Sequence, residues 1–597
     1  MIFACSSRHL SIWIHGVFLG PHYTVLPLIF ITPETLFNSA IQDRLSQIQI
    51  GLFVIDEAHC ISDWGHDFRL EYSRLNITIS NLPADVPVLA TTATANNRVI
   101  ADLEKQLGDN VFVTRGPLAR ESLCIQVMSM PDVETRYAWL AENIPRLQGS
   151  GIIYCLTKRD CDHLSQFLRK HGISAKVYYS RNDSEEELNR SIEEDFKYNR
   201  IKVIVATIKL GMVYDKGDIA FVVHFQMPAN IVSYYQQIGR AGRNIDRAYA
   251  FLMYSKEDED ILQYFINTAF PSEKETQEIV RCLETHGGLS KNDLSTNLNI
   301  NGSHIKKALS FLQHDGFVFK DATRFYLSPK PFYYDAAYYS AITDIRRKEM
   351  EQFKELAHTV GCFSQYVTAC LDDQDAHPCG NCVNCIGHEL LPSTVSPERV
   401  TQARAYIDSL TLSIQPRKKW AATSITKSSK IKYINQEGLC LSQYGRTGYG
   451  VLVKNGKYFQ KKRFCDELVG ASVNFLAAVV KEKGIQAVCY VPSLRSNLVE
   501  DFSERLSQSL GIPVMTALQK LATLPQKAME NSSHQCQNAL QSFKIIPDVA
   551  LPANVLLVDD VVDSGWTLTL CGYLLMEAGC ECVYPFALAD SSRKTNY

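Results

Sequence analysis

The sequence predicts a multidomain α/β protein. At 597 residues the chain is too long for one hydrophobic core, because single cores stop growing at roughly 250–300 residues. Short apolar runs alternate with amphipathic helical patterns in several blocks, as in doubly wound sheets. Hydrophobic residues make up 46% and charged residues 21%, which excludes a disordered, collagen-like or disulfide-scaffold chain. The net charge of -3 means that any nucleic-acid surface must be a local patch.

The first two blocks contain predicted buried parallel strands. The apolar runs 51–56 and 87–91 each end in polar residues, so we expect chemistry at their carboxyl ends. The second block has apolar strand patterns and one amphipathic helix between them. The strands are expected at 151–155, 175–179, 203–207 and 221–225, and the helix at 159–171.

Residues 9–33 carry no Lys, Arg, Asp or Glu, a length that could cross a bilayer. Histidines, glycines and prolines interrupt this stretch, so it cannot form a continuous apolar helix. We expect a buried strand at Val25–Ile31 instead, and no membrane as a partner. The 18 cysteines are too sparse for a secreted disulfide scaffold, so we expect a cytoplasmic protein, nucleoid-associated if bacterial.

The pattern changes to short helices from about residue 273. Three helical segments precede a β-rich end at 317–329, an order typical of a helix-turn-helix with a wing. Such a segment either docks on DNA or serves protein contacts. Residues 391–445 are expected to form a polar linker with a basic stretch, and a third α/β block follows.

An acidic pair ends the strand expected at 51–56. Asp56 and Glu57 open the tetrapeptide Asp-Glu-Ala-His, and such a pair can hold the Mg²⁺ of a nucleoside triphosphate and orient the attacking water. Residues 60–69 (CISDWGHDFR) follow directly, and Thr-Thr-Ala-Thr-Ala at 91–95 ends the next strand. In the second block, residues 233–243 (SYYQQIGRAGR) supply two arginines that could reach a γ-phosphate.

In this order, the motifs over residues 25–265 resemble those of the RecQ family of superfamily 2 DNA helicases. The resemblance implies two RecA-like lobes and a RecQ-like ATP-dependent helicase that moves 3′→5′ on DNA in repair and recombination. It also implies ATP and Mg²⁺ as cofactors and single-stranded, junction or duplex DNA as partner. The implied catalytic residues are Asp56, Glu57, His59, Gln237, Arg240 and Arg243, and the implied DNA-binding residues are Trp64, His66, Phe68 and Arg69.

Two features depart from the family pattern, one at the nucleotide site and one in the motif expected to close the lobes and contact DNA. No segment matches the P-loop form GxxxxGK[ST], and the only Gly-Lys pair, at Gly456, is followed by Tyr458. We therefore expect a shortened reading frame or an eroded relative, whose first lobe is incomplete. Val213 and Asp215 stand where the family usually has glycine and asparagine. A DNA-binding remnant without ATP hydrolysis is the alternative reading.

Four cysteines have the spacing of a metal site. Cys379, Cys382 and Cys385 follow Cys362, and four thiolates at this spacing suit a closed, structural Zn²⁺ site. A disulfide pair is the alternative. The segment resembles the zinc-binding subdomain of RecQ helicases. In that family the zinc subdomain usually precedes the winged helix, whereas here the winged-helix-like segment lies between the second lobe and the cysteines.

The third block ends a strand in two carboxylates, followed by a short polar loop and a helix from about 567. Loop amides and a helix N-terminus favour a phosphate, and the carboxylates suit ribose hydroxyls. The segment resembles the phosphoribosyl pyrophosphate loop of type I phosphoribosyltransferases, and Val491-Pro492-Ser493 with Arg495 resembles their upstream loop. The candidate residues for a phosphorylated ribose ligand are Asp559, Asp560, Asp563, Ser564, Gly565 and Thr567. Group transfer, ligand binding and partner docking all remain open here.

Between 415 and 470 many lysines and arginines are interleaved with aromatic residues, which suits single-stranded DNA. A solvated linker is the alternative. No oligomeric state is predicted. The expected domains are a partial first RecA-like lobe (1–125), a second lobe (126–268), a winged-helix-like segment (269–335), a zinc-binding subdomain (336–390), the linker (391–445) and a phosphoribosyltransferase-like domain (446–592).

Overall fold

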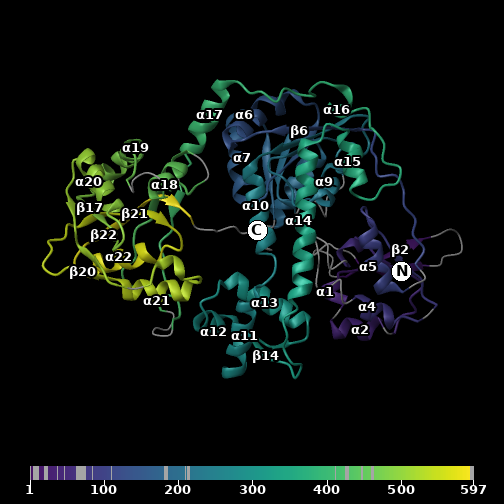
Figure 1. Cartoon of the computed structure of the whole chain (residues 1–597), viewed down its shortest axis with the longest axis horizontal. Coiled ribbons are helices and arrows are strands. Elements are labelled where there is room, and N and C mark those ends of the chain that lie inside the picture. Colours follow the sequence, from purple (N-terminus) through teal and green to yellow (C-terminus); the bar gives the residue numbers. More distant parts are fainter. Residues whose placement is uncertain are drawn as a thin grey trace. The chain divides into compact units, whose positions relative to one another are not determined.

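The computed structural model comprises two compact units, one of Met1–Ala269 with Ala337–Val400 and one of Phe270–Ala336 with Thr401–Lys594. Each unit is an independent α/β body (Figure 1). The structure describes residues 2–4, 12–18, 25–36, 38–45, 47–61, 75–83, 85–108, 111–179, 186–208, 210, 216–410, 412–423, 429–445, 448–458, 463–522 and 524–591.

The first sheet of unit one has the strand order β2-β3-β1-β4-β5. Strand β2 is antiparallel to β3, and the other pairs are parallel. The expected strand Val25–Ile31 is present as β3. The strands are β1 (Ile2–Ala4), β2 (Ile12–Phe18), β3, β4 (Phe53–Ile55) and β5 (Val88–Ala90). The helices are α1 (Pro33–Leu36), α2 (Ser39–Leu45), α4 (Leu75–Ser80) and α5 (Asn97–Leu107), with a 3₁₀ turn at Ala58–Ile61.

The second sheet of unit one is parallel throughout, in the order β6-β11-β10-β7-β9-β8. Four of its strands lie where the sequence predicts them, and β6 and β11 complete it. The strands are β6 (Leu123–Ser129), β7 (Ser150–Tyr154), β8 (Ala175–Tyr178), β9 (Val203–Ala206), β10 (Ile219–His224) and β11 (Ala248–Tyr254). The helices are α6 (Val133–Asn143), α7 (Lys158–Lys170), α8 (Glu186–Lys197), α9 (Ile231–Ile238) and α10 (Lys256–Asn267).

Side-chain caps fix where several of these helices begin. Asn96 accepts a hydrogen bond from the backbone of Val99 at α5, and Thr157 accepts one from Asp160 at α7. Such caps satisfy amide groups that the first helical turn leaves unpaired. The start of each helix is therefore encoded locally, next to the strand that precedes it.

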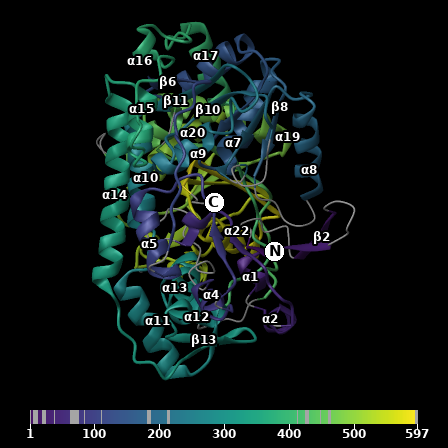
Figure 2. The ribbon, with the colours of Figure 1, turned by 90° about the vertical axis from the view of Figure 1, so that its right-hand side faces the viewer.

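A long helix, α14 (Ala336–His358), packs its apolar face on the second lobe. Phe353 and Leu356 are buried in the same hydrophobic cluster as Ile152 and Val222 of the sheet. Figure 2 shows α14 as one uninterrupted rod. The short helices α15 (Phe363–Ala369) and α16 (Val383–Ile386) follow, then α17 (Pro397–Asp408). Residues of α14 and α15 thus share one hydrophobic core with the second lobe.

In unit two, residues 270–336 form three helices and a small antiparallel sheet, at the positions that the sequence predicts. Capping boxes at Ser272 and Ser290 start the first two helices. The helices are α11 (Glu273–His286), α12 (Lys291–Asn297) and α13 (Gly302–His314). The sheet has the order β12-β14-β13, with β12 (Leu289–Ser290), β13 (Val318–Asp321) and β14 (Arg324–Leu327).

The rest of unit two is built on a six-stranded sheet in the order β15-β16-β22-β21-β17-β18. Only the β15–β16 pair is antiparallel. The strands are β15 (Leu412–Ile414), β16 (Gly438–Gln443), β17 (Ala487–Tyr490), β18 (Val514–Met515), β21 (Asn554–Val562) and β22 (Cys582–Asp590), with a separate pair β19 (Leu518–Lys520) and β20 (Phe543–Ile545). The helices are α18 (Gly448–Tyr458), α19 (Asp466–Glu482), α20 (Leu498–Leu510), α21 (Ser532–Ser542) and α22 (Trp566–Glu577).

The expectation of a linker over 391–445 is corrected by this sheet. Strands β15 and β16 belong to it, and α17 buries Ala403 and Tyr406. The sequence pattern that could have predicted strand β16 is only six residues long and begins with a glycine. A side chain at Gly438 would meet the Pro585 carbonyl oxygen at 2.7 Å, so close pairing with β22 excludes a larger residue.

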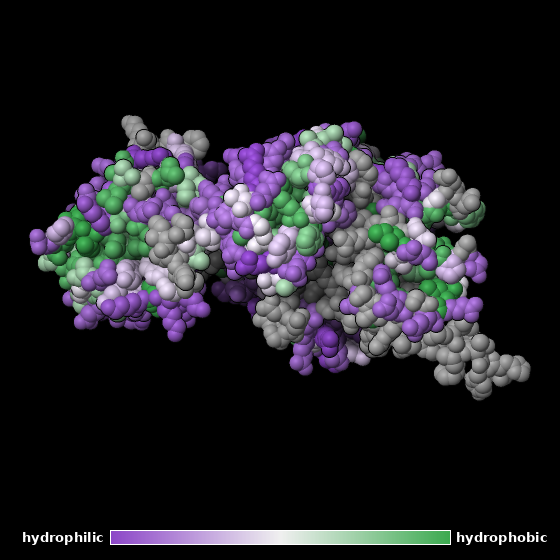
Figure 3. Space-filling model, turned by 90° about the horizontal axis from the view of Figure 1, so that it is seen from below, coloured by the Kyte–Doolittle hydropathy of each residue, from purple (hydrophilic) through white to green (hydrophobic). Residues whose placement is uncertain are grey.

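Among the described residues, no helix is long and apolar enough to cross a membrane. Figure 3 shows hydrophobic side chains on one face as patches among hydrophilic ones. Isolated exposed apolar residues such as Phe112 and Val360 are ordinary for protein surfaces.

Candidate functional site

The acidic pair lies at the carboxyl edge of the first sheet. Ile55 and Ala90 are register partners on β4 and β5, so the residues that follow them are neighbours. Thr91 Oγ1 donates to Asp56 Oδ1 at 3.0 Å, and the Glu57 amide donates to the same oxygen at 3.0 Å. This edge is where parallel α/β sheets carry their chemistry.

Glu57 has a left-handed backbone conformation, with φ of 51°. This conformation costs a non-glycine residue about 1–2 kcal/mol. The Ala58 amide donates to the Thr91 carbonyl at 2.9 Å, which fixes the chain directly after the strained residue. Strain of this kind clusters at functional sites, where surrounding contacts hold it.

His59 joins the acidic pair to the end of β5. Its Nδ1 lies 3.1 Å from Thr92 Oγ1 and 3.2 Å from Glu57 Oε2. Burial alone would lower the pKa of His59, but contacts with Cys60 and Glu57 outweigh it and raise the pKa to about 10. These contacts place the imidazole between the Glu57 carboxylate and the Thr92 hydroxyl.

The second lobe reaches His59 through Gln236. The two Nε2 atoms are 3.5 Å apart. The sequence had singled out Gln237, which instead lies buried with its Oε1 at 2.7 Å from His224 Nε2. Burial lowers the pKa of His224 to about 4, so this imidazole is neutral. Neighbouring positions on a helix point about 100° apart, which is why one glutamine faces the other lobe and the next faces the core.

Arg240 and Arg243 follow the end of α9. Arg240 is half-buried and lies near Tyr154, where its charge opposes the burial that raises the pKa of that phenol to about 12. Arg243 is exposed, and its Nε donates to the Gly239 carbonyl at 3.4 Å. Gly242 has φ of 70°, and a side chain there would meet Ser122 Oγ at 2.6 Å. The glycine therefore determines the path that presents the two arginines.

One carboxylate that the sequence did not reveal connects the two lobes. Glu349 on α14 accepts from Arg98 Nη2 of α5 at 2.8 Å and from Asn230 Nδ2 at 3.0 Å. Asn230 also caps α9, since its Oδ1 accepts from the Ser233 amide at 2.9 Å. The two partners of Glu349 lie 251 and 119 residues away in the sequence, so no local pattern could have identified Glu349.

Several predicted residues lie outside the described residues. These are the candidate DNA-binding residues Trp64, His66, Phe68 and Arg69, and also Val213 and Asp215.

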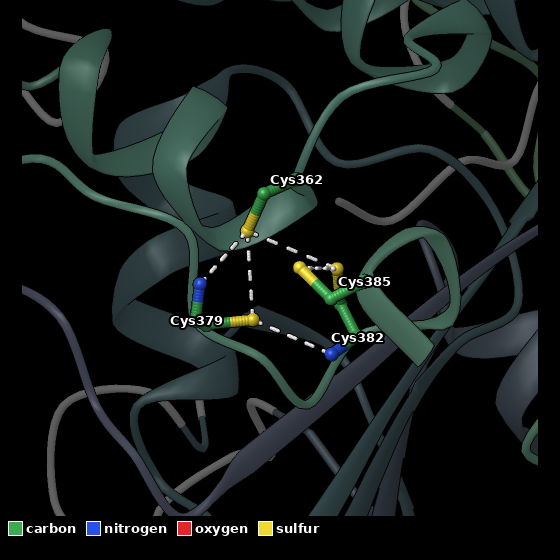
Figure 4. Close-up of side chains that lie close together, drawn as sticks. All are labelled: Cys362, Cys379, Cys382 and Cys385. Carbon is green, nitrogen blue, oxygen red and sulfur yellow. Dashed lines mark hydrogen bonds between the residues drawn. The ribbon is translucent and has the colours of Figure 1, made fainter. Parts of the chain in front are cut away.

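The four cysteines converge on one point, as Figure 4 shows. Their Sγ atoms all lie within 4.8 Å of one another. The Sγ of Cys362 is 3.5 Å from that of Cys379 and 3.8 Å from that of Cys382, and Cys382 is 3.5 Å from Cys385. Sulfurs bound about 2.3 Å from a tetrahedral ion lie about 3.8 Å from one another. The separations fit such an ion.

Backbone amides also point at these sulfurs. The amides of Gln365 and Cys379 donate to Cys362 Sγ at 3.4 and 3.2 Å. Those of Asn381 and Cys382 donate to Cys379 Sγ at 3.4 and 3.3 Å. Such donors stabilise thiolates and orient metal ligands.

In unit two, the carboxylates Asp559 and Asp560 lie within β21, which continues to Val562 instead of ending at the two carboxylates. Burial, and then the neighbouring Asp560, raise the pKa of Asp559 to about 7, against the opposing charge of Lys457. Lys457 Nζ is 2.7 Å from Asp560 Oδ2.

The loop after β21 leads into α22 through Gly565, whose φ is 76°. Arg417 Nε donates to the Ser564 carbonyl at 2.9 Å, and its guanidinium lies 4.2 Å from the centre of the Trp566 ring. Tyr490 and Val558 are register partners, so the loop that follows β17 lies at the same edge.

Three aromatic residues of the basic stretch 415–470 pack within unit two. Trp420 stacks on Trp566 with ring centres 6.0 Å apart, Tyr433 contacts Tyr573 at 5.5 Å, and Phe464 is buried. The expectation of an open stacking platform is corrected for these three residues, because the sheet of unit two uses them for packing.

Comparison with known proteins covers the first two sheets. The description "DEAD/DEAH box helicase" matches residues 20–103, and "Helicase conserved C-terminal domain" matches residues 136–245. Both place the two sheets among helicase lobes of the RecA-like α/β type.

Curated relatives narrow this class. The RecQ-like DNA helicase blm-1 of Caenorhabditis elegans is 35% identical over 42% of this chain and 26% of its own length. The RecQ-like DNA helicase BLM of Xenopus laevis is 36% identical over 39% and 18%, and the ATP-dependent DNA helicase RecQ of Haemophilus influenzae is 34% identical over 40% and 38%. The two lobes are therefore similar to those of RecQ-type DNA helicases. The chain spans between 18% and 38% of the length of these relatives.

Solved structures are more distant. Dbp5 of S. cerevisiae bound to RNA and ADP BeF3 is 20% identical, with a TM-score of 0.33 over 40% of this chain and 61% of that one. The DUF1998 helicase MrfA bound to DNA is 16% identical, with a TM-score of 0.34 over 51% and 44%.

Proposed function

We propose that the chain acts as a RecQ-like, ATP-dependent DNA helicase that moves 3′→5′ on single-stranded DNA in repair and recombination. The observation that carries the proposal is the contact series Glu57–His59–Gln236, which joins the acidic pair of one lobe to the helix of the other. A helicase needs such a connection, because ATP hydrolysis at the edge of one sheet must change how the two lobes bind the DNA strand.

In this mechanism, Asp56 would hold a Mg²⁺ ion, for which carboxylate oxygens are suited. The ion would neutralise charge on the transferred phosphate. Glu57 would orient the attacking water and take its proton, and its backbone is already held in the required position. His59 lies between Glu57 and Gln236 and would transmit the position of the carboxylate to the glutamine. Arg240 would stabilise charge that develops on the phosphate.

Glu57→Gln tests the motor. We expect ATP hydrolysis by the full chain to rise with single-stranded DNA, and to fall about 10²-fold or more in the variant, because general base catalysis is lost. Phosphate release is the measurement, and Glu104→Gln, an exposed carboxylate on the same lobe, is the matched control.

The sequence has no P-loop. Measuring hydrolysis by this chain alone therefore distinguishes a working motor from a protein that only binds DNA. Equal, DNA-independent rates in the wild type and Glu57→Gln, with DNA binding retained, would contradict the motor. They would favour the alternative function of a DNA-binding protein without hydrolysis.

We further propose that Cys362, Cys379, Cys382 and Cys385 hold one structural Zn²⁺ ion. The separations of their sulfurs and the amides that point at them support this assignment. A closed set of four thiolates leaves no position for substrate, so the ion would stabilise the fold next to the second lobe.

The zinc site predicts a stoichiometry. Purified chain should contain about one zinc per molecule, and Cys382→Ser, which removes a buried ligand, should lose the metal and lower the melting temperature. Elemental analysis and thermal unfolding are the measurements. Cys370→Ser, a thiol outside the cluster, should retain full zinc, and equal zinc in both variants would refute the assignment.

A second candidate function belongs to the phosphoribosyltransferase-like part of unit two. Its support is the carboxylate pair Asp559 and Asp560 beside a glycine-initiated helix, with Lys457 and Arg417 close to the loop. A phosphorylated ribose would present hydroxyls to the carboxylates and its phosphate to the loop amides.

Phosphoribosyl pyrophosphate should bind the full chain, and Asp559→Ala with Asp560→Ala should abolish binding, because both groups that face the ribose are removed. Isothermal calorimetry measures this. Asp548→Ala, a carboxylate outside this loop, is the control, and undiminished binding by the double variant would rule out the site.

A further inference from the structure

The α12–α13 turn of the winged-helix-like segment contacts the last domain through two asparagines. Asn299 Nδ2 donates to the Ala528 carbonyl at 2.8 Å, and its Oδ1 accepts from the Glu530 amide at 2.8 Å. In return, Asn531 Nδ2 donates to the carbonyls of Leu298 and Ile300 at 2.6 and 3.0 Å. Each segment thus supplies one side chain that binds the backbone of the other.

These contacts provide hydrogen-bond donors for carbonyl groups of the turn. Leu298 is the C-cap of α12, and α13 begins only four residues later, after Asn301. Carbonyls at a helix C-terminus have no partner within the helix. Ile300 is buried at 2% exposure, so a carbonyl at this position needs a protein donor. Asn531 provides it from more than two hundred residues away.

Asn531 is committed to this role. It is buried at 6% exposure, and its Oδ1 caps α21 by accepting from the His534 amide at 3.0 Å. His534 itself lies against the backbone of Thr296 on α12. The side chain therefore ties the start of α21 to the end of α12.

The same end of α21 touches the candidate phosphate loop. Ser532 follows Asn531 and accepts from Trp566 Nε1 at 2.9 Å, and Trp566 is the first residue after the loop. The contact with the turn and the contact with the residue that follows the loop thus lie on neighbouring residues of the chain.

We infer that the Leu298–Ile300 turn is a protein-docking surface whose partner is the last domain of this same chain. Residues 270–336 and 401–594 then unfold locally and refold as one cooperative unit. Ser303, Lys306 and Ser310 of α13 are exposed, and the two serine hydroxyls donate to Asn301 Oδ1 and to the Lys306 carbonyl.

Asn531→Asp tests the interface in the full chain. Aspartate keeps the cap on α21, since a carboxylate also accepts from the His534 amide. It cannot donate, and it places negative charge against two carbonyl oxygens. Amide hydrogen exchange over 296–303 should accelerate about tenfold, as expected when a buried hydrogen bond is lost.

Asn299→Ala supplies the reciprocal arm, and should accelerate exchange over 526–534 in the other segment. Asn297→Ala removes a side chain whose Nδ2 donates within α12 to the Asp293 carbonyl, and should leave 526–534 unchanged. Effects on the opposite segment distinguish docking from local weakening. If Asn531→Asp and Asn299→Ala each alter only their own segment, the inference is overturned, whatever the outcome of the ligand-binding tests.

Discussion

The functional segments of the two helicase lobes are held in place by one carboxylate that belongs to neither sheet. Glu349 accepts from Arg98, on the helix after β5, and from Asn230, the cap of α9. Its side chain is only 13% exposed, so the charge-assisted bonds are shielded from water and are among the stronger kind. Helix α9 carries Gln236, and thus the contact with His59 depends on where Glu349 holds that helix.

A second constraint acts inside the first lobe. Thr91 holds the residues on both sides of the left-handed Glu57, because its Oγ1 donates to Asp56 and its carbonyl accepts from the Ala58 amide, while Thr92 contacts His59. His59 lies between the Glu57 carboxylate and the end of β5. The acidic pair, the end of β5 and the helix of the second lobe therefore form one connected group, in which a shift at the carboxylate displaces the glutamine.

Local patterns were sufficient to predict the parts of this fold that depend on short segments. Buried strands such as β3, the capped helices of 270–336 and the four cysteines each carry their own signal within a few residues. Contacts between distant segments were not predictable. Nothing near Glu349 marks it as a bridge, and only the phase of α9 decides that Gln236, rather than Gln237, faces His59. Strand β16 was hidden because its six residues lie in a polar region.

His59 and Gln236 face each other across the lobes, and Glu349 holds helix α9 in the position that allows this contact. The most direct test is a short bis-maleimide cross-link in a Cys60→Ser background, with the joined peptides identified by mass spectrometry. We expect efficient joining in His59→Cys/Gln236→Cys, little in His59→Cys/Gln237→Cys, and a reduced yield for the first pair when Glu349→Gln is added. Equal yields for the two pairs, or no effect of Glu349→Gln, would contradict this arrangement.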